Sequence, residues 1–95
     1  MDGMKKEITH KFKGKQYRLR FVDGRELPGK LGECDEPTLE PEIRITVGQK
    51  PRRLLTTIIH ECLHACHWKA TEKDIVATSW AISGALTKLG YKKRN

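Results

Sequence analysis

PRRLLTTIIHECLHACHW, residues 51–68, has the spacing of an amphipathic helix and carries several side chains that can bind a metal. Pro51 lies at the start, where proline favours the first turn of a helix. The apolar positions with helical spacing are Leu54, Leu55, Ile58, Ile59, Cys62, Leu63 and Cys66. At about 100° per residue, their mean direction lies opposite His60 and His64. The sequence therefore predicts a helix over residues 51–68 whose back packs in the core while both histidines face outward.

The motif His60-Glu61-Cys62-Leu63-His64 has the pattern H-E-x-x-H. Two histidines four residues apart lie on one face of a helix, so both imidazoles can converge on a single Zn²⁺. Glu61 lies beside the first histidine and can take a proton from a metal-bound water. The pattern indicates a zinc-dependent peptidase, with His60 and His64 as metal ligands and Glu61 as the general base. Without a metal, the same residues would be two surface histidines and a solvated glutamate.

A catalytic zinc ion usually has three protein ligands and an open position for water, so a third ligand is expected. Glu72 is the predicted third ligand, because a second helix that folds back would return its carboxylate to the site. Asp74 in the same helix is an alternative, although acidic residues also favour helix N-termini without any ligand. His67, which shares the predicted helix face, and Cys34, a loop thiol, are further alternatives.

Two strands are predicted before the motif helix. Residues 17–22 alternate apolar and basic side chains, as in a half-buried strand, and lie in an N-terminal strand region over residues 1–22. Residues 23–41 are rich in Gly and Pro and indicate a loop. Residues 42–48 alternate again and predict a second strand, at the edge of the sheet.

A second helix is predicted over residues 71–90. Thr71 and Asp74 have the spacing of a capping box at its start, and Gly90 suits its C-terminal end. Short connections make successive elements neighbours in space. The sequence therefore predicts a single domain of the α+β class over residues 1–95, in which a small antiparallel sheet packs against an antiparallel helix pair.

The composition favours a compact cytoplasmic protein. The apolar fraction is 37%, and no stretch approaches the roughly 20 apolar residues of a membrane span, so no membrane partner is expected. The N-terminus, from Met1 to Lys6, lacks the apolar core of a signal peptide. The three cysteines, an odd number, do not suggest a disulfide framework, and we expect reduced thiols.

The formal net charge is +7, and basic residues gather toward both ends of the chain. They are Lys5, Lys6, Lys11, Lys13, Lys15, Arg18 and Arg20, then Lys88, Lys92, Lys93 and Arg94. One interpretation is weak contact with nucleic acid or an acidic protein, and the other is a solvated strand face. The charge also supports an alternative function, a small basic nucleic-acid-binding or interaction module with a non-catalytic metal site. Structural zinc sites are rich in cysteine, however, and the sequence has no C-x-x-C pair.

Three stretches of the sequence, the last of which contains the H-E-x-x-H motif, follow the layout of a known family. They are the loop Gly32-Glu33-Cys34-Asp35, the strand Ile43-Arg44-Ile45, and the run from Leu54 through His64-Ala65 and Trp68 to Leu89-Gly90-Tyr91. Together they resemble the small zinc metallopeptidases that are common in phages and prophages, over roughly residues 30–92. Only the H-E-x-x-H motif in this resemblance is highly specific.

The resemblance implies a minimal zincin fold, in which a short sheet precedes the motif helix. It implies a zinc cofactor bound by His60 and His64, with Glu61 as the base, and a protein or peptide substrate in the cytoplasm of the phage's host. The strand at residues 42–48 would be the edge strand that pairs with the extended substrate. The resemblance does not supply the third ligand, because Ala70 stands where metzincins have a third histidine.

Overall fold

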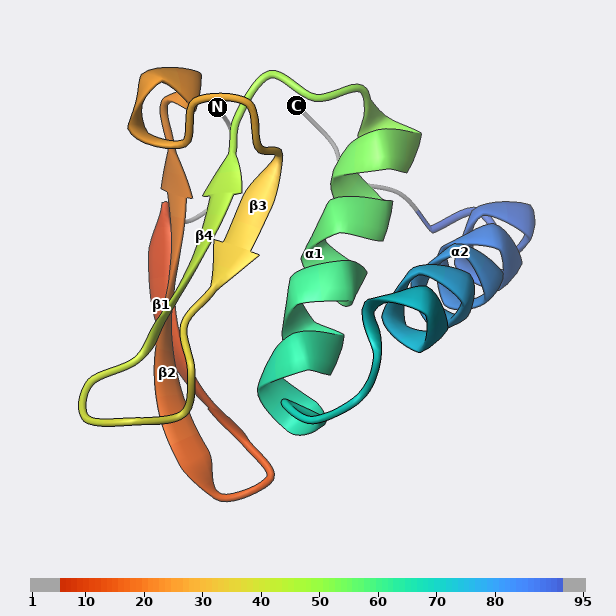
Figure 1. Cartoon of the computed structure of the whole chain (residues 1–95). Coiled ribbons are helices and arrows are strands. Elements are labelled where there is room, and N and C mark those ends of the chain that lie inside the picture. The colour runs from red at the N-terminus through yellow and green to blue at the C-terminus, as the bar shows by residue number, and fades with distance from the viewer. Residues whose placement is uncertain (1–5, 92–95) are drawn as a thin grey trace.

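The computed structural model describes residues 6–91, which form a four-stranded sheet and two helices (Figure 1). Helix α1 (Pro51–Cys66) lies between the sheet and helix α2 (Glu72–Lys88), so the sheet and the two helices form successive layers. The predicted α+β class is confirmed. Residues 1–5 of the predicted N-terminal strand region and the basic residues 92–94 lie outside the described part of the chain.

The sheet consists of β1 (Glu7–Phe12), β2 (Lys15–Val22), β3 (Gly32–Cys34) and β4 (Glu42–Thr46), in the spatial order β1-β2-β4-β3. β1 and β2 form a hairpin whose two turn residues, Lys13-Gly14, have φ values of 51° and 86°. Positive φ at both positions matches the twist of the flanking strands, and glycine adopts it without strain.

The sheet is mixed, which corrects the prediction of an antiparallel sheet. β2 and β4 pair in parallel, whereas β1 pairs with β2, and β3 with β4, in antiparallel fashion. The cause is β3, a short strand inside the region 23–41 that was predicted as a loop and that also contains the 3₁₀ helix η1 (Gly24–Glu26). Because β3 takes the edge and the chain then turns back, β4 enters the sheet parallel to β2. The prediction that residues 42–48 form the edge strand is therefore wrong.

The core lies between the sheet and α1. Its buried residues are Tyr17 and Leu19 of β2, Ile43 and Ile45 of β4, and Leu54 and Ala65 of α1. Side chains alternate between the two faces of a strand, so Arg18 and Arg20 of β2 and Glu42 and Arg44 of β4 lie on the opposite face of the sheet. The alternation predicted for these two strands is therefore confirmed.

Helix α1 begins at Pro51, as predicted, but ends at Cys66 and not at residue 68. The backbone of His67 leaves the helix with φ −138°, and its N–H group bonds to the carbonyl of Leu63. His67 therefore does not continue the helix face that carries the motif histidines.

Helix α2 lies within the predicted range 71–90 and runs back along α1, as predicted (Figure 1). The hydroxyl groups of Thr56 in α1 and Ser83 in α2 are hydrogen-bonded at 2.8 Å, while the start of α2 lies beside the later part of α1. Within residues 6–91, neither helix combines the length and the apolar character needed to cross a membrane.

Candidate metal centre

Helices α1 and α2 bring three side chains together that could hold a metal ion. Glu72 Oε2 lies 3.2 Å from His60 Nε2, and Glu72 Oε1 lies 3.0 Å from His64 Nε2. One ligand atom from each of the three residues lies within 4.8 Å of the other two. In the described part of the chain, no other group of three His, Cys, Asp or Glu side chains has this spacing.

The spacing of the donor atoms fits a metal ion. Nitrogen and oxygen ligands bound at about 2.0–2.1 Å to a tetrahedral metal lie about 3.3 Å apart. Glu72 contacts the two imidazoles through different carboxylate oxygens, at 3.2 Å and 3.0 Å, and one ligand atom from each residue lies within 4.8 Å of the other two, close enough to converge on one ion. Two imidazoles and one carboxylate leave one position of a tetrahedral site free for water or substrate.

The connection between the helices aims Glu72 at α1. The hydroxyl oxygen of Thr71 accepts a hydrogen bond from the N–H group of Asp74 at 3.1 Å, which caps α2 as predicted. Glu72 is consequently the first residue of α2, at the end that lies beside the motif. The buried residues of α2 are Ile75, Ser79 and Ser83, one helical turn apart. The two small serines allow α2 to approach α1 closely.

The alternative ligands do not join this group. Asp74 is exposed, and it contributes to the cap through its backbone. His67 is exposed beyond the end of α1. Cys34 lines the same pocket, but its thiol is not among the three ligand atoms that lie within 4.8 Å of one another. Glu72 is thus the side chain that the structure brings to the histidines.

The environment of His60 favours the form of histidine that binds metals. Burial lowers the pKa of its imidazole and outweighs the opposite effect of the nearby Glu72 carboxylate. The rings of His60 and His64 have their centroids 4.9 Å apart. A lowered pKa keeps the His60 imidazole neutral near pH 7, as metal ligation requires.

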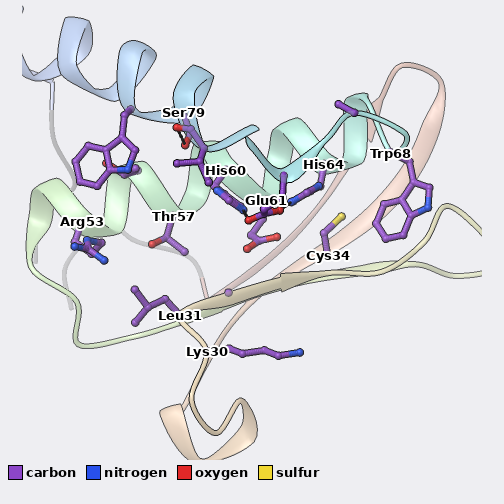
Figure 2. Close-up of a pocket in the computed structure, with 16 residues that line it drawn as sticks. Lys30, Leu31, Cys34, Arg53, Thr57, His60, Glu61, His64, Trp68 and Ser79 are labelled. Carbon is purple, nitrogen blue, oxygen red and sulfur yellow. Dashed lines mark hydrogen bonds and ion pairs between the residues drawn. The ribbon is translucent and has the colours of Figure 1, made fainter. Parts of the chain in front are cut away.

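Glu61 is the buried carboxylate of the site, with only 7% of its surface exposed. Its side chain lies between α1 and β3, on the same pocket wall as His60 and His64 (Figure 2). Burial raises the pKa of Glu61 to about 7, and the negative charge of Glu72 adds to this rise. A carboxyl group whose pKa is near neutrality can both accept and release a proton.

Strand β3 passes close to Glu61 because residue 32 is glycine. A Cβ atom on Gly32 would lie 3.0 Å from Glu61 Oε2 and 2.9 Å from Thr57 Cγ2. Gln49 holds the strand in place, since its amide donates to the carbonyl of Leu31 at 3.2 Å and accepts from the Thr57 hydroxyl at 2.8 Å. These contacts fix β3 against α1 beside the Glu61 carboxylate.

The three candidate ligands and Glu61 line a pocket of about 690 Å³ between β3, α1 and α2. This volume is within the range of about 300–1,000 Å³ that is usual for ligand sites. Trp68 lies at one end of the pocket and Arg53 at the other, with Leu31 and Cys34 on the opposite wall (Figure 2). The pocket is therefore long enough to hold more than a metal ion.

Gly32, Gln49 and Arg53 belong to this site but were not predicted from the sequence. Arg53 had a detectable signal, because it lies seven residues before His60 and hence on the same helix face. Gln49 lies in the connection before α1, where no periodic pattern marks it. Gly32 lies in a loop with several glycines, and nothing in the sequence distinguishes it from the others.

No protein-family model matches this sequence, and no curated protein or solved structure is significantly similar to it. The geometry of the site is therefore the main basis for inferring a function.

Proposed function

We propose that the protein is a zinc-dependent peptidase, related to the small zinc metallopeptidases of phages that residues 30–92 resemble. The observation that carries the proposal is the convergence of His60, His64 and Glu72 in one pocket with the buried carboxylate of Glu61. Two histidines and a carboxylate, with one open position, are a donor set that suits catalytic zinc. A bound zinc ion would polarise a substrate carbonyl and make water more acidic.

The residues of the site then have two roles, metal binding and proton transfer. His60, His64 and Glu72 would hold the zinc ion. Glu61 accepts a proton from the attacking water and returns it to the amine that leaves when the peptide bond breaks. The Glu61 side chain lies between α1 and β3, on the same pocket wall as His60 and His64, which supports both steps.

The substrate strand is proposed to lie along β3, which replaces β4 in this role. β3 uses alternate residues to pair with β4: the Leu31 carbonyl accepts from Thr46 N–H at 3.0 Å, and Asp35 N–H donates to the Glu42 carbonyl at 2.9 Å. The backbone groups of the intervening residues therefore face the open edge of the sheet. An extended peptide can add to this edge beside Glu61.

The alternative function, a basic nucleic-acid-binding module, has less support from the described residues. Arg18 contacts Glu7 and Glu42, and Arg20 also contacts Glu42. These arginines are therefore neutralised within the sheet and do not form a free basic patch.

The proposal is tested with Glu61→Gln. We expect this variant to bind zinc like the parent and to hydrolyse peptides at least about 100-fold more slowly, because the amide cannot accept the proton from water. The measurements are zinc content and hydrolysis of a mixed fluorogenic peptide library. A fully active Glu61→Gln variant would end the proposal.

A further inference from the structure

Arg53 lines the pocket without a carboxylate partner among residues 6–91. Apart from Arg52 and Arg53, every arginine in this range forms an ion pair with at least one carboxylate. These four arginines are Arg18, Arg20, Arg25 and Arg44. The two guanidinium groups without an internal anion are therefore adjacent in the sequence, and one of them faces the candidate site.

The indole ring of Trp80 in α2 contacts both guanidinium groups, and of the two arginines Arg53 is the one that lines the pocket with it. Arg52 Cζ and Arg53 Cζ lie 5.4 Å and 5.6 Å from the centroid of its ring. Two like charges beside one ring repel each other, and the first turn of α1 contains no acidic residue to offset them. When a guanidinium group stacks on an aromatic ring, the N–H donors at the edge of the guanidinium stay free to bind a planar anion such as a carboxylate. An added carboxylate would relieve the repulsion.

The position of Arg53 on α1 fixes its distance from the candidate metal centre. Arg53 and His60 are seven residues apart, so they lie on one helix face at about 10 Å along the axis. An extended peptide covers this distance with about three residues. The β3 wall runs from Leu31, near Arg53, toward Cys34, near Trp68 (Figure 2). A peptide that pairs antiparallel with β3 would thus have its C-terminal part beside Arg53.

We propose that Arg53, oriented by Trp80, binds a carboxylate of the substrate about three residues to the C-terminal side of the cleaved bond. This inference rests on the proposed peptidase function for the nature of the substrate. The carboxylate belongs either to an Asp or Glu side chain or to the free C-terminus of the peptide. In both cases the site selects acidic peptides, and bidentate pairing with the guanidinium provides the selection.

The test measures peptide binding by calorimetry to zinc-loaded Glu61→Gln protein, which does not consume the ligand. The peptides share one apolar sequence, carry Asp or Asn at a single position that is moved along the chain, and have a blocked or a free C-terminus. We expect about tenfold tighter binding of the Asp peptide at one position, or of the free C-terminus. Adding Arg53→Gln should remove this preference, and adding Arg53→Lys should retain part of it.

Arg25→Gln is the matched control, because it removes an arginine that is paired with Asp23 and does not line the pocket. This control should keep the full preference. An equal preference in Arg53→Gln, or no preference at any position, would overturn the assignment. Tighter binding of an oligothymidylate than of any peptide, lost in Arg53→Gln, would also overturn it in favour of a phosphate ligand.

The two proposals fail in different ways. Parent protein that cleaves peptides without any Arg53-dependent preference would contradict the carboxylate site and leave the peptidase intact. An Arg53-dependent preference in protein that cleaves nothing would support the carboxylate site and contradict the peptidase.

Discussion

At the scale of single residues, the carboxylate of Glu61 is held where it can exchange protons because its neighbour in β3 has no side chain. The Glu61 Oε2 atom occupies space that any Cβ on Gly32 would approach to 3.0 Å. The same approach excludes water and raises the pKa of Glu61 to about 7. The reactivity of this carboxylate is therefore set by packing as well as by its neighbour charges.

Gly32→Ala should disturb this arrangement. The added methyl group must displace β3 or the Glu61 side chain, so we expect the free energy of unfolding to fall by about 1–3 kcal/mol. Peptide hydrolysis should fall further than stability alone explains, while zinc affinity should change little, because the three ligands lie on the helices. Chemical unfolding, zinc titration and hydrolysis of the same samples check the three parts.

Gly24→Ala is the matched control, because a Cβ atom on Gly24 would meet nothing within 4 Å. It should resemble the parent in all three measurements. Gly32→Ala protein with the stability and activity of the parent would show that the close approach of β3 has no role in the site.

The residues that could be predicted from the sequence are those fixed by helical spacing. His60, Glu61 and His64 follow from the four-residue repeat within one helix, and Glu72 follows from a helix that folds back. Gln49 could not be predicted, because its role depends on the distance between α1 and the Leu31 carbonyl. Contacts of this kind arise from tertiary packing and leave no local pattern.

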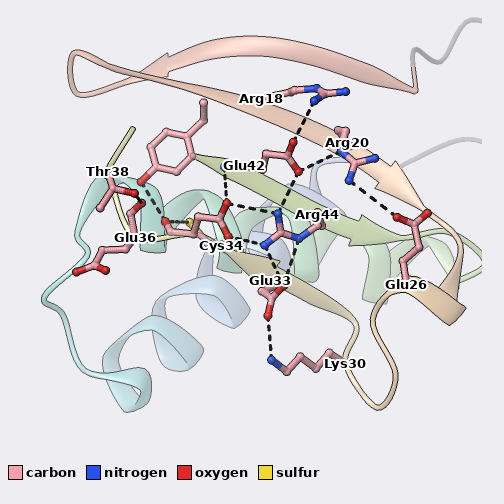
Figure 3. A network of polar contacts seen from close by, with 12 residues as sticks. Arg18, Arg20, Glu26, Lys30, Glu33, Cys34, Glu36, Thr38, Glu42 and Arg44 are labelled. Carbon is pink, nitrogen blue, oxygen red and sulfur yellow. Dashed lines mark hydrogen bonds and ion pairs between the residues drawn. The ribbon is translucent and has the colours of Figure 1, made fainter. Parts of the chain in front are cut away.

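At the scale of secondary-structure elements, the outer face of the sheet holds β3 in place through charge (Figure 3). Arg44 of β4 binds the carboxylates of Glu33 and Asp35 from the β3 segment and of Glu42 from its own strand. Only 18% of the Arg44 side chain is exposed. The hydrogen bond from Arg44 is the main cause that lowers the pKa of Asp35, and Lys30 and Arg44 together lower the pKa of Glu33.

Stability should therefore depend on pH through these carboxylates. Their pKa values are lower in the folded protein, so their contribution is complete above the ordinary values of 3.8 and 4.5 and is lost as the pH falls below them. We expect Arg44→Met to lower the free energy of unfolding by about 1–2 kcal/mol at neutral pH. This difference from the parent should shrink below about pH 4 in urea unfolding measured across the pH range.

Arg25→Met provides the control, since the Arg25 side chain is 91% exposed and pairs with Asp23, away from the Arg44 network. It should differ little from the parent at any pH. A deficit of Arg44→Met that stays constant from neutral to acidic pH would show that the ion pairs do not stabilise the fold.

β3 is the strand that could not be predicted from the sequence. The strands at residues 17–22 and 42–48 have alternating patterns long enough to detect, and both are present. β3 spans only Gly32–Cys34, in a region rich in glycine and proline, so its sequence contains no pattern of alternation. Missing this strand made the sheet seem antiparallel and placed β4 at the edge.

At the scale of the whole molecule, the candidate metal centre exists only because α2 returns along α1. Two candidate ligands come from α1 and the third is the first residue of α2, so a bound metal would join two layers of the fold. Metal binding should thus stabilise the folded chain as well as create the reacting centre. The proposed carboxylate subsite would extend the use of the same pocket toward the first turn of α1, where Arg53 lies.

The most direct measurement is a zinc titration of the parent, Glu72→Ala and Asp74→Ala by calorimetry. We expect one zinc ion per parent chain, at least about tenfold weaker binding by Glu72→Ala, and parent-like binding by Asp74→Ala. Asp74 is the matched control, because it lies in the same first turn of α2 and caps the helix through its backbone. A parent that binds no zinc, or a Glu72→Ala variant that binds it as tightly as the parent, would contradict the His60, His64 and Glu72 site.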